Sequence, residues 1–200
     1  VDQLQVQKII IGYDHRFGKN RTADINNLIT FGTQYGFEVE QISAQEIDAI
    51  SISSTKIRNA LELGDIDLAN QYLGYSYFLS GTVVKGKQLG RTIGFPTANI
   101  DLEEAYKLVP KNGVYVVAAE IDGKTVFGMM NIGFNPTVQG QNRTIEVHFF
   151  DFDSDIYNRQ IRVAVLQRIR SEEKFGSVEL LTNQLKKDRK ITKNYLQNLK

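Results

Sequence analysis

The chain has 200 residues, of which 42% are hydrophobic and 24% charged, and its formal net charge is +1. This composition is typical of a globular protein with one large or two small domains, and the small charge gives no reason to expect nucleic acid or a membrane as partner. The absence of cysteine excludes disulfides and thiolate chemistry and favours a cytoplasmic location. No apolar run approaches the roughly 18 residues of a transmembrane helix.

The first 75 residues alternate between strand and helix patterns. An apolar run over residues 8–12 ends in glycine and predicts a buried parallel strand, and residues 36–42 alternate like a second strand. Asp65 is a predicted N-cap, and Gly74 follows the end of the same helix. Helical spacing predicts three helices: residues 22–35, 54–63 and 65–73. The alternation is typical of an α/β fold, and two strands alone would leave an exposed sheet edge or face.

From residue 77 the hydrophobic pattern changes to a series of strands. Gly123 marks a tight hairpin after Asp122. Several strands in series indicate a small closed antiparallel barrel. The strands are predicted over residues 77–84, 113–121, 125–132, 143–150 and 160–169.

The chain ends with helical patterns. Residues 177–187 predict an amphipathic helix with Leu180, Leu181 and Leu185 facing inward, and residues 191–199 predict a second helix. The change of pattern near residues 74–76 places a domain boundary there, so we expect one domain over residues 1–75 and another over residues 76–200.

A glycine-rich segment, residues 86–99, carries the clearest functional signal. Glycines let backbone N–H groups approach a ligand, and lysine and arginine attract phosphate oxygens. The segment is neither a Walker A loop nor a dinucleotide-binding motif, because it lacks their spacing. Taken alone, it also fits an ordinary glycine-rich β-loop with a turn at Phe95-Pro96. The predicted phosphate-binding residues are Gly86, Lys87, Gly90 and Arg91.

Thr97 and Asn99 are two residues apart, so in an extended segment their side chains point to the same side. Neutral oxygen ligands beside phosphate suit Mg²⁺, which takes few protein ligands. The spacing therefore predicts a magnesium site that is completed by the phosphates of a nucleotide.

The run Gly94-Phe95-Pro96-Thr97-Ala98-Asn99 resembles the signature of riboflavin kinases. Further motifs follow in the order of that family: Gly113-Val114-Tyr115, Asn131-Ile132-Gly133-Phe134-Asn135-Pro136-Thr137-Val138, Ile145-Glu146-Val147-His148, Asp151-Phe152-Asp153-Ser154-Asp155-Ile156-Tyr157 and Arg168-Ile169-Arg170-Ser171-Glu172-Glu173-Lys174-Phe175. The resemblance implies a six-stranded, Greek-key-like β-barrel with a C-terminal helix. It also implies that Thr97 and Asn99 hold the magnesium of ATP, and that the segment ending at Val138 is a loop before the catalytic strand.

Glu146 is the candidate catalytic residue, because the resemblance places the family's catalytic glutamate there. On a strand, Glu146, His148 and Phe150 share one face. A carboxylate there can orient the acceptor hydroxyl and take its proton. Without the resemblance, a solvated strand residue would be the ordinary interpretation, and for His148 we expect a structural role.

Arg170 and Phe175 are the candidate flavin-binding residues. The family's Arg-x-Glu-x-Lys-Phe segment is a mobile flap near the flavin, and the resemblance implies the same role for residues 170–175. Planar and apolar surfaces suit an isoalloxazine ring. A charged loop leading into the last helix is the alternative.

The N-terminal part resembles bacterial FAD synthetases at residues 9–21 and 53–58. The second match implies that Ser54, Thr55 and Arg58 meet ATP phosphates at a helix start, although an ordinary N-cap beside a surface arginine is the alternative. The chain lacks the His-x-Gly-His-type motif that adenylyltransferases of this kind require. We therefore expect residues 1–75 to be the second half of a Rossmann-like α/β nucleotidyltransferase domain.

The sequence thus predicts an α+β protein that phosphorylates riboflavin to FMN with ATP and Mg²⁺, without an obligate protein partner. FMN adenylylation to FAD is expected of the full-length parent and not of this chain. A non-catalytic flavin- or nucleotide-binding module remains the alternative from another class.

Overall fold

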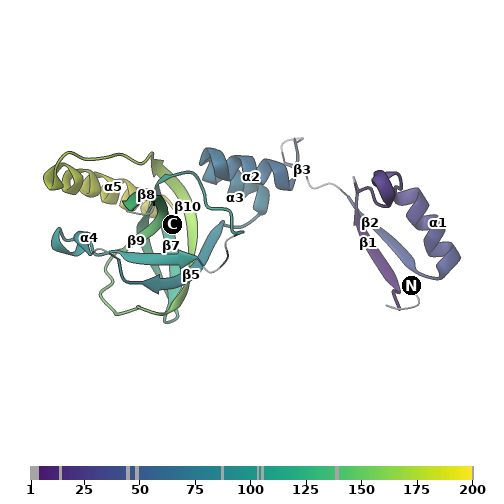
Figure 1. The fold of residues 1–200 in the computed structure, drawn as a ribbon, viewed down its shortest axis with the longest axis horizontal. Coiled ribbons are helices and arrows are strands. Elements are labelled where there is room, and N and C mark those ends of the chain that lie inside the picture. The colour runs from purple at the N-terminus through teal and green to yellow at the C-terminus, as the bar shows by residue number, and fades with distance from the viewer. Residues whose placement is uncertain are drawn as a thin grey trace. The chain divides into compact units, whose positions relative to one another are not determined.

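The computed structural model describes residues 5–13, 15–43, 46–47, 50–86, 88–102, 104, 106–137 and 140–199. The chain divides into two compact units, Val1–Ser53 and Ser54–Lys200. The two units have different architectures (Figure 1).

The N-terminal unit contains a parallel pair of strands, β1 (Lys8–Gly12) and β2 (Glu38–Ile42), connected through helix α1 (Ile25–Tyr35). Its core consists of Ile11, Leu28 and Phe37. A short 3₁₀ helix and a small hairpin complete its described elements: η1 (Lys19–Arg21), β3 (Glu46–Ile47) and β4 (Ile50–Ser51). The predicted strand–helix–strand order is confirmed.

Local signals set the ends of α1. The side chain of Asp24 accepts hydrogen bonds from the backbone N–H groups of Asn26 and Asn27, which satisfies donors that a helix start leaves unpaired. Gly36 ends the helix with a φ of 75°, a conformation that glycine adopts without the Cβ strain of other residues.

Six strands of the second unit, among the residues that the structure describes, form a closed antiparallel barrel. The order around the barrel is β10-β5-β6-β9-β8-β7, so the antiparallel pair β5 and β6 lies between β10 and β9. This confirms the predicted α+β fold with its six-stranded barrel. The strands are β5 (Phe78–Val84), β6 (Ala98–Leu102), β7 (Gly113–Ile121), β8 (Lys124–Thr137), β9 (Gly140–Phe149) and β10 (Gln160–Arg170).

Helices α2 (Ser54–Leu63) and α3 (Ile66–Leu73) pack on the barrel. Leu61 and Ile66 are buried in the same core cluster as residues of the strands. The side chain of Asn70 donates to the carbonyl oxygen of Val165 on β10 at 2.9 Å and accepts from the backbone N–H of Tyr77 at 2.7 Å. The compact unit therefore begins at Ser54, earlier than the boundary at residue 75 that the change of pattern predicts.

Helix α5 (Val178–Asn198) covers the outside of the barrel near β8 and β10. The sequence analysis predicts two helices here, and this is wrong: no glycine or proline lies between residues 187 and 191, so one helix continues. Leu180 is 56% exposed rather than inward, whereas Leu185 packs on a second core cluster with Phe95 and Phe150.

Two more elements differ from expectation. The segment expected as a loop before β9 is strand up to Thr137, because β8 pairs with β9 from Gly128 to Thr137. Val138 lies outside the described residues. The glycine-rich segment contains a short helix, α4 (Leu89–Thr92), and β6 follows it as a barrel strand.

Candidate active site

Thr97 and Glu146 meet although they are far apart in the sequence. The hydroxyl of Thr97 donates to Oε2 of Glu146 at 3.2 Å. The pairing of β6 with β9 brings them together, because it places Asn99 directly opposite Glu146. Side chains of opposed residues lie on the same face of a sheet, so all three polar groups share one face.

Asn131 extends this polar row on the other side of Glu146. In the pairing of β8 with β9, Asn131 is opposite Glu146, and both line the same cavity. The sequence analysis quotes Asn131 within a motif without giving it a role. Its position depends on the register of two strands, which a single strand pattern does not contain.

Gly86 and Gly90 shape the site by close packing. A Cβ on Gly86 would lie 2.1 Å from the amide nitrogen of Asn99, so the Gly86 backbone is pressed against that side chain. A Cβ on Gly90 would lie 2.2 Å from the carbonyl oxygen of Phe95. The backbone N–H of Phe95 donates to the carbonyl oxygen of Gly90 at 2.8 Å, which keeps the two residues close. These contacts require glycine, whether or not the same backbone meets phosphate. Lys87 lies outside the described residues.

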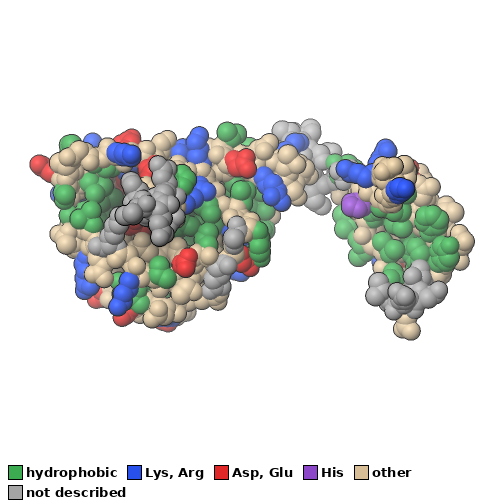
Figure 2. Space-filling model, viewed as in Figure 1, with side chains coloured by type: hydrophobic (Ala, Val, Ile, Leu, Met, Phe, Trp, Pro, Cys, Tyr) green, Lys and Arg blue, Asp and Glu red, His purple; other side chains and the backbone are tan. Residues whose placement is uncertain are grey.

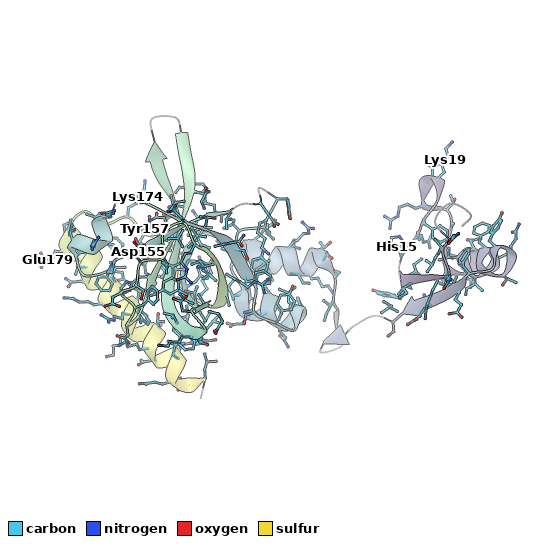
Figure 3. All side chains as sticks on the ribbon, turned by 90° about the horizontal axis from the view of Figure 1, so that it is seen from below. His15, Lys19, Asp155, Tyr157, Lys174 and Glu179 are labelled. Atoms are coloured by element: carbon cyan, nitrogen blue, oxygen red, sulfur yellow. The ribbon has the colours of Figure 1, made fainter. Side chains whose placement is uncertain are left out.

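Two cavities meet at Gln88 and Thr97, which line both. The first has a volume of about 380 Å³ and is also lined by Arg91 and by the segment between β9 and β10. Asp155 and Tyr157 of that segment are labelled in Figure 3, and the carboxylate of Asp155 accepts from the backbone N–H of Tyr157 at 2.9 Å.

The second cavity has a volume of about 560 Å³ and contains Glu146. Arg170 and Phe175, the two candidate flavin-binding residues, also line it. Flat aromatic ligands suit apolar walls, and polar side chains such as Glu146 and Asn131 line the same cavity. Its apolar walls include Ile93, Phe95, Val114, Met129, Leu181 and Leu185.

His148 connects β9 to the segment that carries Thr97. Nδ1 of His148 lies 2.8 Å from the carbonyl oxygen of Pro96. Since a carbonyl oxygen only accepts, Nδ1 carries the proton and donates. Burial lowers the pKa of His148, the Pro96 bond partly opposes this, and the charge of Arg189 lowers it further. The ring is therefore neutral at pH 7 and holds Pro96, which is the structural role expected.

Arg170 does not point a free guanidinium into the second cavity. It forms a salt bridge with Asp188 of α5, with 2.8 Å between Nη2 and Oδ2. Its guanidinium also lies 5.7 Å from the centre of the Phe175 ring. The sequence analysis misses Asp188, because an acidic residue in a charged helix pattern reads as a solvated side chain.

Comparison with known proteins identifies the barrel. Residues 73–196 match the protein-family model described as Flavokinase: Riboflavin kinase. This chain belongs to the riboflavin kinase family. Residues 1–56 match a second family model, described as FAD synthetase.

Two curated relatives are both called bifunctional riboflavin kinase/FMN adenylyltransferase. The protein of Pseudomonas fluorescens is 41% identical over 189 residues, which are 94% of this chain and 60% of the relative. The protein of Bacillus subtilis is 40% identical over 202 residues, covering 98% of this chain and 63% of the relative. The chain thus spans about three-fifths of the length of these relatives.

A solved structure from Streptococcus pneumoniae, described as a macrolide-efflux protein, has a TM-score of 0.82 and 38% identity. It covers 92% of this chain, and this chain covers 60% of it. The description of that structure refers to transport, whereas the names of the two curated relatives refer to a kinase and an adenylyltransferase. Within the described residues of this riboflavin kinase family member, every helix is too short or too polar to cross a membrane.

The predicted residues at the start of α2 lie apart from the two cavities. Ser54, Thr55 and Arg58 are exposed on the first turns of α2, and none of them lines either cavity. The FAD synthetase match ends at residue 56 and the riboflavin kinase match begins at residue 73, so most of α2 and α3 falls between them.

Proposed function

We propose that this chain transfers the γ-phosphoryl group of ATP to the 5′-hydroxyl of riboflavin and releases FMN. The observation that carries the proposal is the 3.2 Å contact between Thr97 and Glu146, at the point where the two cavities meet. Membership of the riboflavin kinase family supports riboflavin as the acceptor.

The second cavity is the proposed acceptor site. Its apolar walls would enclose the isoalloxazine ring, with Arg170 and Phe175 on one side. The ribityl chain would then extend toward Glu146, whose carboxylate orients the terminal hydroxyl and accepts its proton as the hydroxyl attacks. Phosphoryl transfer depends chiefly on such positioning and on neutralising charge.

The first cavity is the proposed nucleotide site. Arg91 and Thr97 line it. Gly90 lines the second cavity instead, and Gly86 packs against the Asn99 side chain. Lys87 is assigned to the phosphates from the sequence. The negative charge of the triphosphate would then lie beside Thr97, next to the acceptor hydroxyl.

Thr97 and Asn99 are the proposed magnesium ligands. Their side-chain oxygens lie on the face that Glu146 also occupies, and oxygen donors are what Mg²⁺ prefers. Within the described residues no cluster of three His, Asp or Glu side chains competes as a metal site. When bound, Mg²⁺ would neutralise charge on the transferring phosphate. Neutral protein ligands imply that the ion arrives with ATP.

FMN adenylylation is the second candidate function. The FAD synthetase match over residues 1–56 and the names of the curated relatives support it. Ser54, Thr55 and Arg58 would be its phosphate-binding residues. We expect no FAD from this chain, because its 200 residues lack the histidine motif of such adenylyltransferases. The cytoplasmic location and the absence of nucleic-acid, membrane and obligate protein partners stay predictions.

The test is to incubate the chain with riboflavin, Mg²⁺ and ATP and to separate the flavins by chromatography, with Glu146→Gln beside it. We expect FMN without FAD, and loss of FMN in the variant. Bound riboflavin without FMN would instead support the non-catalytic module. FAD in the product would establish the second candidate function.

A further inference from the structure

Asp188 is a buried carboxylate that the proposed chemistry does not use. Its side chain is 0% exposed, in the middle of α5. Nε of Arg170 donates to Oδ1 at 3.0 Å and to Oδ2 at 3.1 Å, and Nη2 donates to Oδ2 at 2.8 Å. Gln184, one turn earlier on α5, donates to Oδ1 at 2.9 Å. The carboxylate is therefore fully engaged.

Folding stability alone does not explain the buried ion pair between Arg170 and Asp188. Burying two charges costs about as much free energy as their attraction returns, and well-packed apolar residues often stabilise equally well. What a two-pronged arginine–carboxylate pair adds is a defined position for the guanidinium plane.

Arg170 ends β10 and begins the strap, residues 171–177, which joins β10 to α5. Its Nη1 donates to the carbonyl oxygen of Ser171 at 2.9 Å, and its guanidinium lies 5.7 Å from the centre of the Phe175 ring. One side chain thus contacts both the first residue of the strap and Phe175 further along it. Lys174 within the strap and Glu179 in the first turn of α5 are labelled in Figure 3.

The strap forms one wall of the second cavity. Phe175 of the strap lines it together with Arg170 of β10 and Leu181 of α5, and none of the three lines the first cavity. A second, exposed set of hydrogen bonds also fixes the strap. The carboxylate of Glu172 accepts from the side-chain amide of Asn112 at 3.1 Å and from the backbone N–H of Phe134 at 3.2 Å. Exposed polar contacts contribute little to stability, so the buried Arg170–Asp188 pair holds the strap more strongly than the Glu172 contacts do.

We propose that Asp188 is a positioning residue for the acceptor site: through Arg170 it sets the place of the strap and of Phe175, and so the width of the riboflavin cavity. This inference rests on the proposed function, because it takes riboflavin as the occupant. Loss of the pair would weaken riboflavin binding and leave ATP binding unchanged, since the nucleotide cavity shares none of these residues.

The experiment compares Asp188→Asn with Thr192→Val in the whole chain. Asn keeps the size of the side chain and loses its charge. Thr192 is also 0% exposed on α5 and donates to the backbone carbonyl of Asp188, but it lines neither cavity, so its variant controls for weakened helix packing. Riboflavin binding without ATP is measured by quenching of flavin fluorescence, and KM values are measured for both substrates, well below each unfolding temperature.

For Asp188→Asn we expect the riboflavin Kd and KM to rise roughly tenfold or more, because small misplacements of binding groups are costly. The KM for ATP should stay within about twofold, as for separate sites. Thr192→Val should leave all three constants near those of the parent. Equal shifts for both substrates, or an unchanged riboflavin Kd in the folded variant, would overturn the inference.

Arg170→Lys keeps the test decisive if Asp188→Asn fails to fold. Lysine retains the buried positive charge and loses the planar fork, the Ser171 contact and the stacking on Phe175. The same selective loss of riboflavin binding is expected. If the parent makes FMN and the variants bind riboflavin normally, only the inference fails. If the parent binds riboflavin and makes no FMN, the proposed function fails, and the binding comparison still decides the inference.

Discussion

The two compact units bury their apolar residues to different extents. The barrel unit closes its sheet, and its core combines side chains from the strands with Leu61 and Ile66 of the two preceding helices. The N-terminal unit has a small core of Ile11, Leu28 and Phe37 around a pair of parallel strands. Figure 2 shows hydrophobic side chains on the surface of this unit. Its large exposed apolar side chains include Ile10, Ile29, Phe31, Tyr35 and Ile42.

The difference follows from sheet closure. A closed barrel has no edges and one packed interior, whereas parallel strands are usually covered on both faces and a two-stranded sheet is marginal alone. We therefore expect the barrel unit, which contains the residues of the proposed kinase site, to be the more stable of the two.

The largest effect is expected for Glu146→Gln. Removing the carboxylate removes the group that orients the acceptor hydroxyl, and kcat should fall roughly 10²- to 10⁴-fold. Chromatographic measurement of FMN formation checks this. Glu120→Gln, on the exposed side of β7, is the control and should turn over like the parent. Turnover near the parent value in Glu146→Gln would show that another group accepts the proton.

The second prediction concerns the boundary between the units. Ile66 is 1% exposed within the barrel core, so Ile66→Ala should lower the free energy of unfolding of the barrel by about 2–5 kcal/mol. Leu28→Ala removes a core residue of the N-terminal unit and should leave barrel unfolding unchanged. Urea titration with riboflavin fluorescence as the probe measures both.

The opposite pattern, with the barrel insensitive to Ile66→Ala, would favour the domain boundary at residue 75 that the sequence predicts. In that case α2 and α3 would unfold with the N-terminal unit, despite the contact of Asn70 with Val165.

Local sequence patterns predict much of the secondary structure, because strands and helix caps depend on residues that are close together in the chain. Residues 113–121 and Asp65 are where the sequence analysis places them. The family resemblance directs attention to Thr97 and Glu146, which the barrel brings together.

Features that depend on long-range register are missed. Asn131 becomes a neighbour of Glu146 only through the pairing of β8 with β9. Asp188 is buried where α5 packs on the barrel, and there it pairs with Arg170 of β10. The outward position of Leu180 has the same origin, since the path of α5 over the barrel decides which side of the helix is covered.

The third prediction contrasts two glycines of the barrel unit. In Gly86→Ala the new Cβ would meet the Asn99 side chain at 2.1 Å, so we expect Asn99 to move and the efficiency with MgATP to fall by up to about 100-fold. Gly123 has a φ of +72° and open space around it, so Gly123→Ala should cost only about 1 kcal/mol of strain and leave turnover unchanged.

Initial rates at varied ATP and Mg²⁺, together with thermal unfolding, separate the two glycine variants. A Gly86→Ala protein with normal ATP and Mg²⁺ dependence would mean that Asn99 does not act at the nucleotide, and the magnesium assignment would have to change.

The smallest effect is a pH dependence that distinguishes the two histidines, one in each unit. Burial holds the pKa of His148 below its ordinary 6.5. As the pH falls from 6.5 toward that lowered value, the unfolded chain binds a proton that the folded chain does not, so the free energy of unfolding decreases; above 6.5 this group contributes no slope. In His148→Asn the amide can still donate to the Pro96 carbonyl, and the pH slope should disappear.

His15→Asn, an exposed change in the N-terminal unit, is the control. Urea titrations on both sides of pH 6.5 measure the slope, and a slope that persists in His148→Asn would place its origin in other groups.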